Sequence, residues 1–525
     1  MTRIAKLCLA LLIGGAVTSG IQAAPAAETG AAVRDRVRAY RAAHEREIVG
    51  ELSALLAIPN VANNLPDIRR NADHLLAMLR RRGFTARLLE GGEGSRLAVY
   101  GELLTPGATR TVVFYAHYDG QPVDPSKWAS DPWKPVLRTG PLGEGVRDVD
   151  LATVQGQLDP EWRLFARSAS DDKAPIVAVL TALDALRAAG IPPSVNLKLF
   201  LEGEEEAGSG HLTDILHRHA PLLAADAWLL CDGPVHQTRR MQVFFGARGV
   251  TGLNLTVYGP LRPLHSGHYG NWAPNPAVEL AHLVASLRDE DGRILIPGFY
   301  DDVRPLTAAE RKAIAELPDV ETGLRRELGL GRSEGGDARL QERVMLPALN
   351  LRGLKAGDVG ETAANAIPTE ARASIDFRLV PDETPAGIQK KVEDHIRQQG
   401  WTLVDAAPDL ATRLAHPKIV RAQWSLDYPP ARTDMTLPFS RAVVAAVSEA
   451  VDPAARPVVQ VPILGGSVPM YLFTDTLHVP IVGVPMVNHD NNQHGSNENL
   501  RLQNLWDGIE VFGVVMARLN ALWKE

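Results

Sequence analysis

The sequence predicts an α/β protein with a mostly parallel sheet, helices on both faces of that sheet, and an inserted α+β domain. Short apolar segments rich in β-formers alternate with helical segments between residues 111 and 231, as in βαβ units. From residue 243 onward, polar and apolar residues alternate as they do in antiparallel strands. A chain of 525 residues also exceeds the length at which one core usually divides, so we expect two or more domains.

The first residues resemble an export signal. Arg3 and Lys6 precede an apolar stretch over residues 7–17, and small residues follow it. This pattern predicts a cleaved signal peptide over residues 1–23 and a secreted, periplasmic protein. A retained N-terminal anchor is the alternative, although the stretch is short for a membrane span. Removal of the signal would leave Cys231 as the only cysteine, so no internal disulfide is expected.

Residues 29–242 are predicted to form the first part of a catalytic α/β domain. Apolar residues at intervals of three and four indicate helices, glycine ends one of them, and uninterrupted β-rich apolar runs indicate buried strands. The predicted helices are 33–58, 71–84 and 173–189, and the predicted strands are 111–117, 195–202 and 227–231.

The inserted α+β domain is predicted over residues 243–430, and residues 431–525 complete the first domain. Strands and helices are interleaved in the insertion, and a polar segment within it is expected to form a loop with short helices. In the insertion, the predicted strands are 243–259 and 371–381, the helices are 277–289 and 385–400, and the polar segment is 300–345. In residues 431–525, the predicted helix is 438–451 and the predicted strand is 479–486.

Charge and composition narrow the possible functions. The formal net charge is -7 and no basic tract is present, so neither nucleic acid nor stable membrane association is expected. With 45% hydrophobic and 22% charged residues, the chain has the composition of a soluble globular protein. Chemistry on a small molecule or a peptide is therefore the better hypothesis.

Carboxylate and imidazole side chains gather where the predicted parallel strands end. Open α/β sheets bind ligands at that edge. Each residue alone has an ordinary explanation, because histidines occupy loops, aspartates cap helices and glutamates face solvent. Together, converging carboxylates would repel one another unless cations offset their charge. The residues are His117, Asp119, Asp171, Asp172, Glu205, Glu206, Asp232 and His494.

A pair of divalent metal ions would satisfy such a cluster. Two ions can share a carboxylate, activate water and polarise a carbonyl group. Mixed histidine and carboxylate ligands favour zinc, with manganese or cobalt as alternatives. Glu202 and Glu204 stand in the same acidic run, and we expect them to be either structural support or solvated charge.

Seven short motifs resemble one family of enzymes. In order they are HYDGQP, SASDDK, EGEEEAGS, CDGP, LHSG, GGSVP and QHGSNE. They resemble the dinuclear metallopeptidases that include carnosinases, non-specific dipeptidases, glutamate carboxypeptidase, acetylornithine deacetylase and succinyl-diaminopimelate desuccinylase. The segments DPSKWASDPWKP and DGRILIPGFYDDV are most similar to the carnosinase and dipeptidase branch. The resemblance implies a phosphorylase/hydrolase-like sheet, an inserted lid and dimerisation domain, and a homodimer.

The resemblance also implies roles at the metal site. Asp171 would bridge the two ions, His117 and Asp232 would complete one shell, and Glu206 and His494 would complete the other. By the same resemblance, the general base that moves the proton of the attacking water is Glu205, and the residue that orients His117 is Asp119.

The inserted domain is implied to supply substrate contacts. His265 in LHSG resembles the residue that reaches across a dimer to stabilise the developing oxyanion, and His268 is a competitor for that role. Arg378 resembles the clamp on the substrate carboxylate, a task suited to a bidentate guanidinium group. The remaining residues implied to line the pocket are Asn365, Gly465, Gly466 and Ser467.

Three positions depart from the family pattern. Ser168 and Ala174 stand where members commonly carry glycine, and Leu464 stands where dipeptidases often have an acidic residue. The last change bears on recognition of the substrate's free amine. The resemblance as a whole still predicts hydrolysis of dipeptides or short peptides near a free carboxylate. The alternatives are an N-acyl amino acid deacylase and, in another class, an inactive metal-dependent binding protein.

Overall fold

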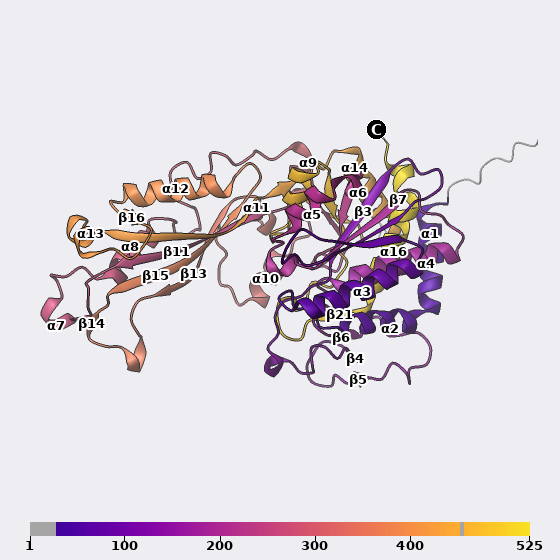
Figure 1. The fold of residues 1–525 in the computed structure, drawn as a ribbon, viewed down its shortest axis with the longest axis horizontal. Helices are drawn as coiled ribbons and strands as arrows, with labels where there is room; N and C mark the ends of the chain where they lie inside the picture. The colour runs from indigo at the N-terminus through magenta and orange to yellow at the C-terminus, as the bar shows by residue number, and fades with distance from the viewer. Residues whose placement is uncertain (1–27, 452–455, 525) are drawn as a thin grey trace, which may run out of the picture.

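The computed structural model describes residues 28–451 and 456–524, which form two bodies (Figure 1). A catalytic body surrounds an eight-stranded sheet, and an elongated body surrounds a separate five-stranded sheet. The chain leaves the first body through β10 (Gly246–Ala247) and returns through β18 (Ala431–Arg432), and these strands pair antiparallel. The predicted α/β class with an inserted α+β unit is confirmed.

The eight-stranded sheet has the order β1-β2-β7-β3-β8-β20-β9-β19. Its central strands β7, β3, β8 and β20 run parallel, whereas β1 and β2 at one edge are antiparallel, as is β9 to β20. The sheet is therefore parallel where the predicted βαβ units lie and mixed toward its edges. The strands are β1 Thr85–Leu89, β2 Ala98–Leu103, β3 Thr111–His117, β7 Asn196–Glu202, β8 Ala227–Leu230, β9 Gln242–Phe244, β19 Val459–Val461 and β20 Ile481–Gly483.

Helices cover both faces of this sheet because its strands are apolar on both sides. In β3, Val112 and Phe114 belong to one buried cluster, and Val113 and Tyr115 belong to another. The first cluster is closed by α1 Gly30–Ala43, α2 Glu45–Leu56, α3 Leu65–Arg81, α4 Lys173–Ala188, α14 Pro438–Ala450 and α16 Leu502–Leu522. The second is closed by α5 Leu212–Arg218, α6 Ala220–Leu223 and α15 Met470–Thr476.

Two predicted helices have different bounds in the structure. The helix predicted over 33–58 is broken at His44, whose ring nitrogen Nδ1 bonds to the carbonyl oxygen of Tyr40 instead of continuing the helical pattern. The helix predicted over 71–84 begins earlier, because the Asn64 side chain accepts the amide N–H of Asp67 and caps it.

A small four-stranded sheet, β21-β6-β4-β5, was not predicted. It joins distant segments, since β21 (Asn499–Arg501) pairs antiparallel with β6 (Arg163–Phe165). Consequently the loop before β21 lies beside the loop before α4. The other two strands are β4 Val136–Arg138 and β5 Asp148–Val149, and a 3-10 helix, η1, spans Pro125–Lys127.

The inserted body is a sheet with helices on one face. Leu253, Leu255 and Val257 of β11 pack with α8 and α12, while Asn254 and Thr256 point to the other face. Its sheet order is β13-β15-β11-β17-β16. The elements are β11 Gly249–Tyr258, β13 Ala348–Lys355, β15 Glu370–Leu379, β16 Thr402–Val404, β17 Ile419–Tyr428, α8 Pro276–Ala285, α12 Pro385–Gln398 and α13 Leu410–Ala415.

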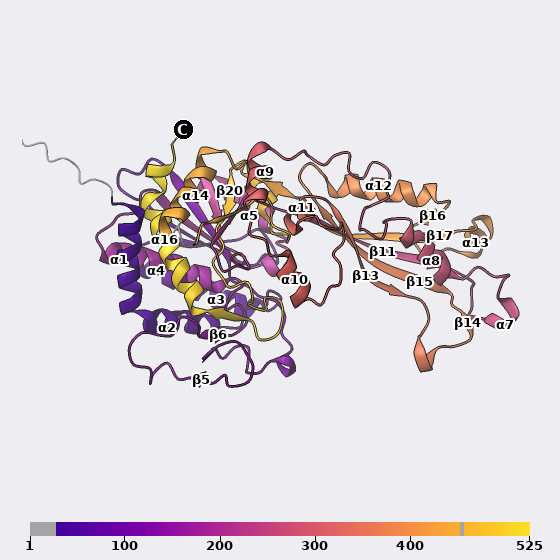
Figure 2. The same cartoon turned by 180° about the vertical axis from the view of Figure 1, so that it is seen from behind.

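Both ends of the inserted body carry short elements. The tip farthest from the catalytic body holds β12 (Leu264–His265), α7 (Ser266–Tyr269) and β14 (Ala366–Ile367), as two opposite views show (Figures 1 and 2). The polar segment 300–345 contains three short helices, as predicted: α9 Ala308–Ala315, α10 Glu321–Glu327 and α11 Leu340–Val344. One further 3-10 turn, η3, spans Gly360–Thr362.

Within residues 28–451 and 456–524, we find no helix with the length and apolar character needed to cross a bilayer. The predicted division into residues 29–242, 243–430 and 431–525 stays a prediction, and β9 at residues 242–244 lies in the eight-stranded sheet.

Candidate metal centre

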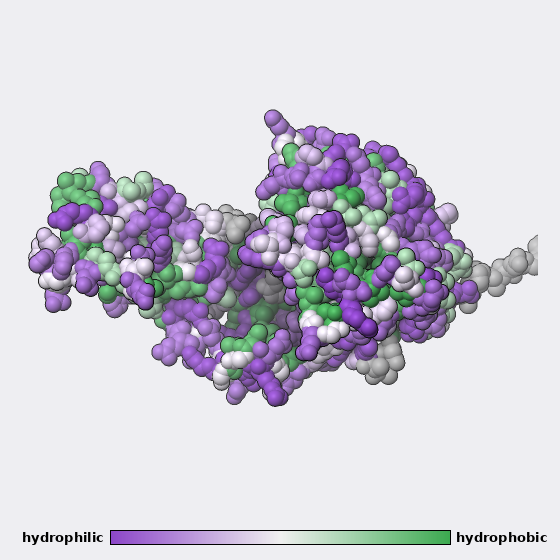
Figure 3. Space-filling view, turned by 90° about the horizontal axis from the view of Figure 1, so that it is seen from below, coloured by the Kyte–Doolittle hydropathy of each residue, from purple (hydrophilic) through white to green (hydrophobic). Residues whose placement is uncertain are grey.

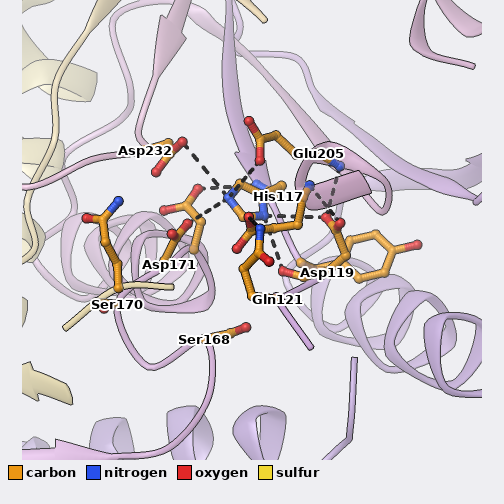
Figure 4. A network of polar contacts seen from close by, with 12 residues as sticks. His117, Asp119, Gln121, Ser168, Ser170, Asp171, Glu205 and Asp232 are labelled. Atoms are coloured by element: carbon orange, nitrogen blue, oxygen red, sulfur yellow. Dashed lines mark hydrogen bonds and ion pairs between the residues drawn. The ribbon is translucent and has the colours of Figure 1, made fainter. Parts of the chain in front are cut away.

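The candidate site lies at the carboxyl ends of three adjacent parallel strands. His117 is the last residue of β3, Glu205 begins the short 3-10 helix η2 (Glu205–Ala207) after β7, and Asp232 follows β8. Because β7, β3 and β8 are neighbours in the sheet, their ends deliver these side chains to one place (Figure 4). The polar residues after the strands therefore meet, as the sequence predicted.

Asp171 lies between the two histidines of the site. Its Oδ1 atom is 2.9 Å from Nε2 of His117, and its Oδ2 atom is 3.1 Å from Nε2 of His494. The carboxylate therefore faces both imidazole rings at once. Glu205 and Asp232 approach from the other strands, each with a carboxylate oxygen 3.9 Å from Nε2 of His117 (Figure 4).

Glu206 completes the half of the site around His494. Its Oε2 atom is 3.2 Å from Nε2 of His494 and accepts a hydrogen bond of 2.7 Å from the Gln121 side-chain amide. Gln121 belongs to the motif HYDGQP but was not predicted as a site residue. Its position in that motif, two residues after Asp119, was the only available signal.

Asp119 is fully buried and holds two parts of the site together. Its carboxylate accepts the amide N–H groups of Glu205 and Glu206 at 3.1 Å and 2.9 Å. Its Oδ1 atom is also 3.4 Å from Nδ1 of His117. Nδ1 of His117 is closer to the backbone oxygen of Asp119, at 3.2 Å. The orienting role implied for the Asp119 side chain stays a prediction, and its hydrogen bonds to η2 were not predicted.

The other two glutamates of the acidic run are structural support, not solvated charge. Glu202 is buried and accepts the hydroxyl of Tyr115 at 2.7 Å. Glu204 is buried between Nη1 of Arg96 and Nδ1 of His211, both 2.9 Å away. The run therefore divides between two residues that face the site and two that anchor the turn after β7.

Glu498 shapes the loop that presents Asp171, and it was missed in the sequence. It is buried completely, and its two oxygens accept five hydrogen bonds of 2.8 to 2.9 Å. Since Glu498 lies four residues after His494, it ties the two loops of the site together. The donors are Nη1 of Arg167, the amides of Ser168, Ser170 and Asp171, and the hydroxyl of Ser170.

The crowded carboxylates resist ionisation. Burial, followed by the negative charge of Asp171, raises the pKa of Glu206 to about 7 and that of Asp232 to about 6. Burial is also the main reason that the pKa of Glu205 lies well above its usual range, and Asp232 and Glu206 add to it. Several buried carboxyl groups in one place thus lack enough positive charge among the protein's own side chains.

Asp171 and the two histidines show the opposite effect. Burial opposes ionisation of Asp171, but hydrogen bonds with His117 and His494 outweigh it and lower its pKa. The hydrogen bond to Asp171 raises the pKa of His494 to about 9. Burial acts to lower the pKa of His117, yet its bonds to Asp119 and Asp171 raise it overall. Protons on the rings occupy the positions where cations would be expected.

Two groups of donor atoms fit metal ions. One group contains Asp171, Glu206 and His494, and the other contains His117, Asp172 and Asp232, with the donor atoms of each group within 4.8 Å of one another. Each set contains three nitrogen or carboxylate donors, and Asp171, which belongs to one set, also faces His117 of the other. This arrangement suits two divalent ions. The predicted metal ligands therefore lie where two ions could be held.

Asp172 is the one member of these groups that received no predicted role. Its Oδ2 atom accepts the backbone N–H of His117 at 3.2 Å, and the side chain is fully buried. The consecutive aspartates in SASDDK signalled it, but spacing alone could not separate the roles of the pair. Oδ1 of Asp171, at 2.9 Å from the imidazole of His117, is better placed to share a ligand with it.

A second part of the candidate site lies where the two bodies meet. The guanidinium Nη1 of Arg378 donates to the Ser467 hydroxyl at 2.9 Å. The neighbouring carbonyl of Gly465 accepts from Nε of Arg248 at 3.2 Å, and the carbonyl of Gly466 accepts from its backbone N–H at 3.2 Å. The predicted substrate residues Arg378, Gly465, Gly466 and Ser467 are thus brought together, with Arg248 as an unpredicted member.

The remaining predicted residues lie at the tip of the inserted body. His265 pairs with Ala366 in β14, and the carbonyl of Asn365 accepts the amide of Ser266 at 3.0 Å. The rings of His265 and His268 are 4.5 Å apart. Figure 1 shows this tip at the opposite end of the molecule from the eight-stranded sheet, so one chain does not bring His265 or Asn365 to its own metal centre.

Comparisons with known proteins agree with this geometry. A family model described as peptidase family M20/M25/M40 matches residues 113–518. The chain is 27% identical over 484 residues to a Cys-Gly metallodipeptidase, dug1, of Schizosaccharomyces pombe, with 89% of this chain and 94% of the relative covered. It is 25% identical over 519 residues to a human Beta-Ala-His dipeptidase, with 94% of each covered.

A solved structure resembles the whole fold. The M20 family metallo-carboxypeptidase Sso-CP2 of Sulfolobus solfataricus superposes with a TM-score of 0.72 at 27% identity, covering 90% of this chain and 99% of that one.

The relatives correct one prediction. The Cys-Gly metallodipeptidases of Schizosaccharomyces pombe, Candida albicans and Saccharomyces cerevisiae to which this chain is similar are intracellular proteins. The prediction of a secreted, periplasmic protein is therefore wrong. The signal peptide predicted over residues 1–23 lies outside the described residues.

Proposed function

This chain belongs to peptidase family M20/M25/M40, whose members depend on two metal ions, and from that premise we propose that it hydrolyses dipeptides or short peptides beside a free carboxylate. Its metallodipeptidase relatives identify it as a hydrolase of the peptidase class. The proposal concerns the substrate, the residues that act on it and the physiological metal, for which we propose zinc with manganese and cobalt as alternatives.

The observation that carries this proposal is the position of Asp171. Its two oxygens face two different histidines at 2.9 and 3.1 Å, and each histidine lies beside a further carboxylate. In the proposed assignment, Asp171 bridges the ions, His117 and Asp232 hold one, and Glu206 and His494 hold the other. Bound there, two ions would polarise the carbonyl of the scissile bond and make a water molecule more acidic.

We propose that Glu205 moves the proton. Its Oε2 atom lies 3.9 Å from Nε2 of His117, so it borders the same space as the metal-binding atoms. It would accept a proton from the attacking water and deliver it to the leaving nitrogen. The hydrogen bond from the Glu205 amide to Asp119 fixes the start of η2 and therefore the direction of this carboxylate. Asp119 also orients the imidazole of His117.

The substrate contacts are proposed on both bodies. Arg378, held beside Ser467, would bind the free carboxylate, and Gly465 and Gly466 would line the same pocket. His265 would stabilise the oxyanion and Asn365 would contribute to the pocket from a second chain. Their place at the tip of the inserted body supports a homodimer, because a single chain leaves them far from its metal centre.

A deacylase of N-acyl amino acids is the second candidate, and Leu464 favours it. This residue precedes the loop of Gly465 and Gly466 and packs against an apolar cluster, where dipeptidases often carry an acid. A leucine offers no charge to a substrate's free amine. The same metal ions and the same base would cleave an amide that has no free amine.

Purified protein loaded with zinc, manganese or cobalt tests both candidates. We expect turnover of dipeptides, loss of turnover on chelation, and slower turnover of the matched N-acetyl amino acids. Glu205→Gln should lower kcat by about 10²- to 10⁴-fold and leave the metal content unchanged. The matched control is Glu47→Gln, at an exposed position on α2. Full activity of Glu205→Gln, or insensitivity to chelation, would contradict the proposal; faster turnover of N-acetyl substrates would favour the deacylase.

A further inference from the structure

Arg248 occupies the crossing between the two bodies. It stands between β10 and β11, and its backbone N–H donates to the carbonyl oxygens of Leu464 and Gly466, both at 3.2 Å. Its side chain turns to the same loop, where Nε donates to the carbonyl of Gly465 at 3.2 Å. The main chain and the guanidinium group of Arg248 thus both contact the loop over residues 464–467.

Arg248 and Arg378 are neighbours on one face of the inserted sheet. Val250 of β11 pairs with Arg378 of β15. Arg248 precedes Val250 by two residues, so its side chain leaves the same face, diagonally across from Arg378. Arg378 reaches Ser467 at 2.9 Å, at the other end of the loop that Arg248 contacts. The two guanidinium groups therefore contact Gly465 and Ser467, which lie two positions apart in one loop.

The two arginines are not equally neutralised. Arg378 has the carboxylate of Asp376 at 3.6 Å from its Nε atom. Among the described side chains, none offers Arg248 a carboxylate within 4.0 Å, and its side chain bonds only to the carbonyls of Gly465 and Leu346. Burial, followed by the positive charge of Arg378, lowers the pKa of Arg248 to about 10. Paired arginines with one carboxylate between them are suited to receive another anion.

Arg248 and the loop it contacts border space that a substrate could occupy. Arg248 lines a cavity of about 670 Å³, and Leu464 and Gly466 line another of about 1080 Å³ that also contacts Gln493, the neighbour of His494. The surface is hollowed where the inserted body meets the catalytic body (Figure 3). An anion bound at the loop would therefore lie where the two bodies meet.

We propose that Arg248 binds the terminal carboxylate of the substrate together with Arg378, so that the enzyme selects peptides with a free C-terminus over their amides. This inference rests on the proposed function. It assigns a second cation to the carboxylate pocket, beside the Ser467 hydroxyl that Arg378 contacts. Each charged hydrogen bond to a carboxylate should account for about 10- to 100-fold of the preference.

The test compares, within each protein preparation, the kcat/KM for a dipeptide with the kcat/KM for its amide. We would determine kcat/KM for a dipeptide and for the same dipeptide amide with wild type, Arg248→Met, Arg248→Lys and Arg378→Met. The control is Arg372→Met, which removes an exposed guanidinium group from the same sheet. Because both substrates share one enzyme sample, changes in folding or metal content cancel from the ratio.

Arg248→Met should reduce the preference for the free carboxylate by about 10-fold or more, and Arg248→Lys should restore part of it. Arg372→Met should leave the preference unchanged. The double variant Arg248→Met with Arg378→Met should lose less than the product of the single effects, since both groups bind one carboxylate. Equal losses on the dipeptide and the amide would show that Arg248 only braces the loop and would overturn the inference.

Failure of the proposed function gives a different result. If no peptide were hydrolysed, calorimetry of the metal-loaded protein with glycine and with glycinamide would still test the site. Glycine should bind more tightly than glycinamide to wild type, and Arg248→Met should remove most of that difference. Equal affinities for glycine and glycinamide in wild type would contradict the role of Arg248.

Discussion

Replacing Glu498 by glutamine tests whether a buried carboxylate outside the proposed ligand set builds the metal centre. One oxygen of Glu498 accepts Nη1 of Arg167 and the amide of Ser168, and the other accepts three donors from Ser170 and Asp171. In Glu498→Gln, the new NH₂ group must face donors whichever way the amide turns. At least two hydrogen bonds are lost.

The cost can be worked from these contacts. Hydrogen bonds that involve a charged group contribute about 1.5 to 3 kcal/mol each, so the smaller set of two predicts a loss of about 3 to 6 kcal/mol. The side chain of Arg167 is only 3% exposed, and it would be left without its carboxylate. Breaking a buried ion pair costs about 3 to 5 kcal/mol, which agrees with the first figure.

The effect should reach the metals through Asp171. Its amide N–H is held by Glu498 at 2.9 Å, so movement of the loop shifts the proposed bridging carboxylate. Changes to groups that orient ligands typically lower metal affinity by about 10- to 100-fold. Glu498→Gln should therefore lower both the unfolding temperature of the metal-free protein and its affinity for zinc, measured by thermal denaturation and by competition with a chelator.

Glu510→Gln is the matched control. Glu510 is also buried and pairs with Arg38 and Arg41, but on α16, away from the site. It should lose stability while zinc affinity stays at the wild-type value. Wild-type zinc affinity in a folded Glu498→Gln variant would refute the reasoning, because it would mean that the Asp171 loop holds its position without Glu498.

Three further predictions concern protons and backbone space. The pKa values of about 7 for Glu206, 6 for Asp232 and 9 for His494 mean that metal binding must release protons. The raised carboxyl pKa values stabilise the metal-free fold at acid pH, and this contribution is lost as pH rises through 6 to 7. Zinc affinity should instead increase with pH, and calorimetry in buffers of different ionisation enthalpy should detect the released protons. A zinc affinity that does not depend on pH would be the contrary result. Ser168 has a φ of 61°, so Ser168→Gly should relieve backbone strain but lose the hydrogen bond that the Asn60 side-chain amide donates to the Ser168 hydroxyl. The two effects oppose each other, so the unfolding temperature should stay within about 3 °C of wild type. A larger fall would contradict this balance. A Cβ atom at Gly203 would meet a buried tyrosine hydroxyl and a carbonyl oxygen, so Gly203→Ala should cost about 1 to 3 kcal/mol in thermal denaturation, and an unchanged stability would show that the turn after β7 yields easily.

The sequence predicted the parts of this molecule that are governed by local pattern. Strand β3 is a run of β-forming apolar residues, which is typical of a strand buried on both faces, and a polar motif follows it directly. The same pattern precedes Glu205 and Asp232. Convergence of these side chains follows from the rule that ligands bind at the carboxyl ends of parallel strands.

Contacts between distant segments could not be predicted in the same way. Glu498 acts on Asp171 only because β21 pairs with β6, two three-residue strands with no detectable pattern. Arg248 reaches the loop at Gly465 only because the chain crosses between the bodies at that residue. Single polar residues of this kind carry no periodic signal, so their partners become visible only in three dimensions.

The central claim is that Asp171 is shared by two metal ions. Anomalous diffraction from crystals of the zinc-loaded protein, recorded above and below the zinc absorption edge, tests it most directly. We expect two zinc peaks per chain: one between Asp171, His117 and Asp232, and one between Asp171, Glu206 and His494. A single peak, or two peaks that leave Asp171 outside both coordination shells, would contradict it.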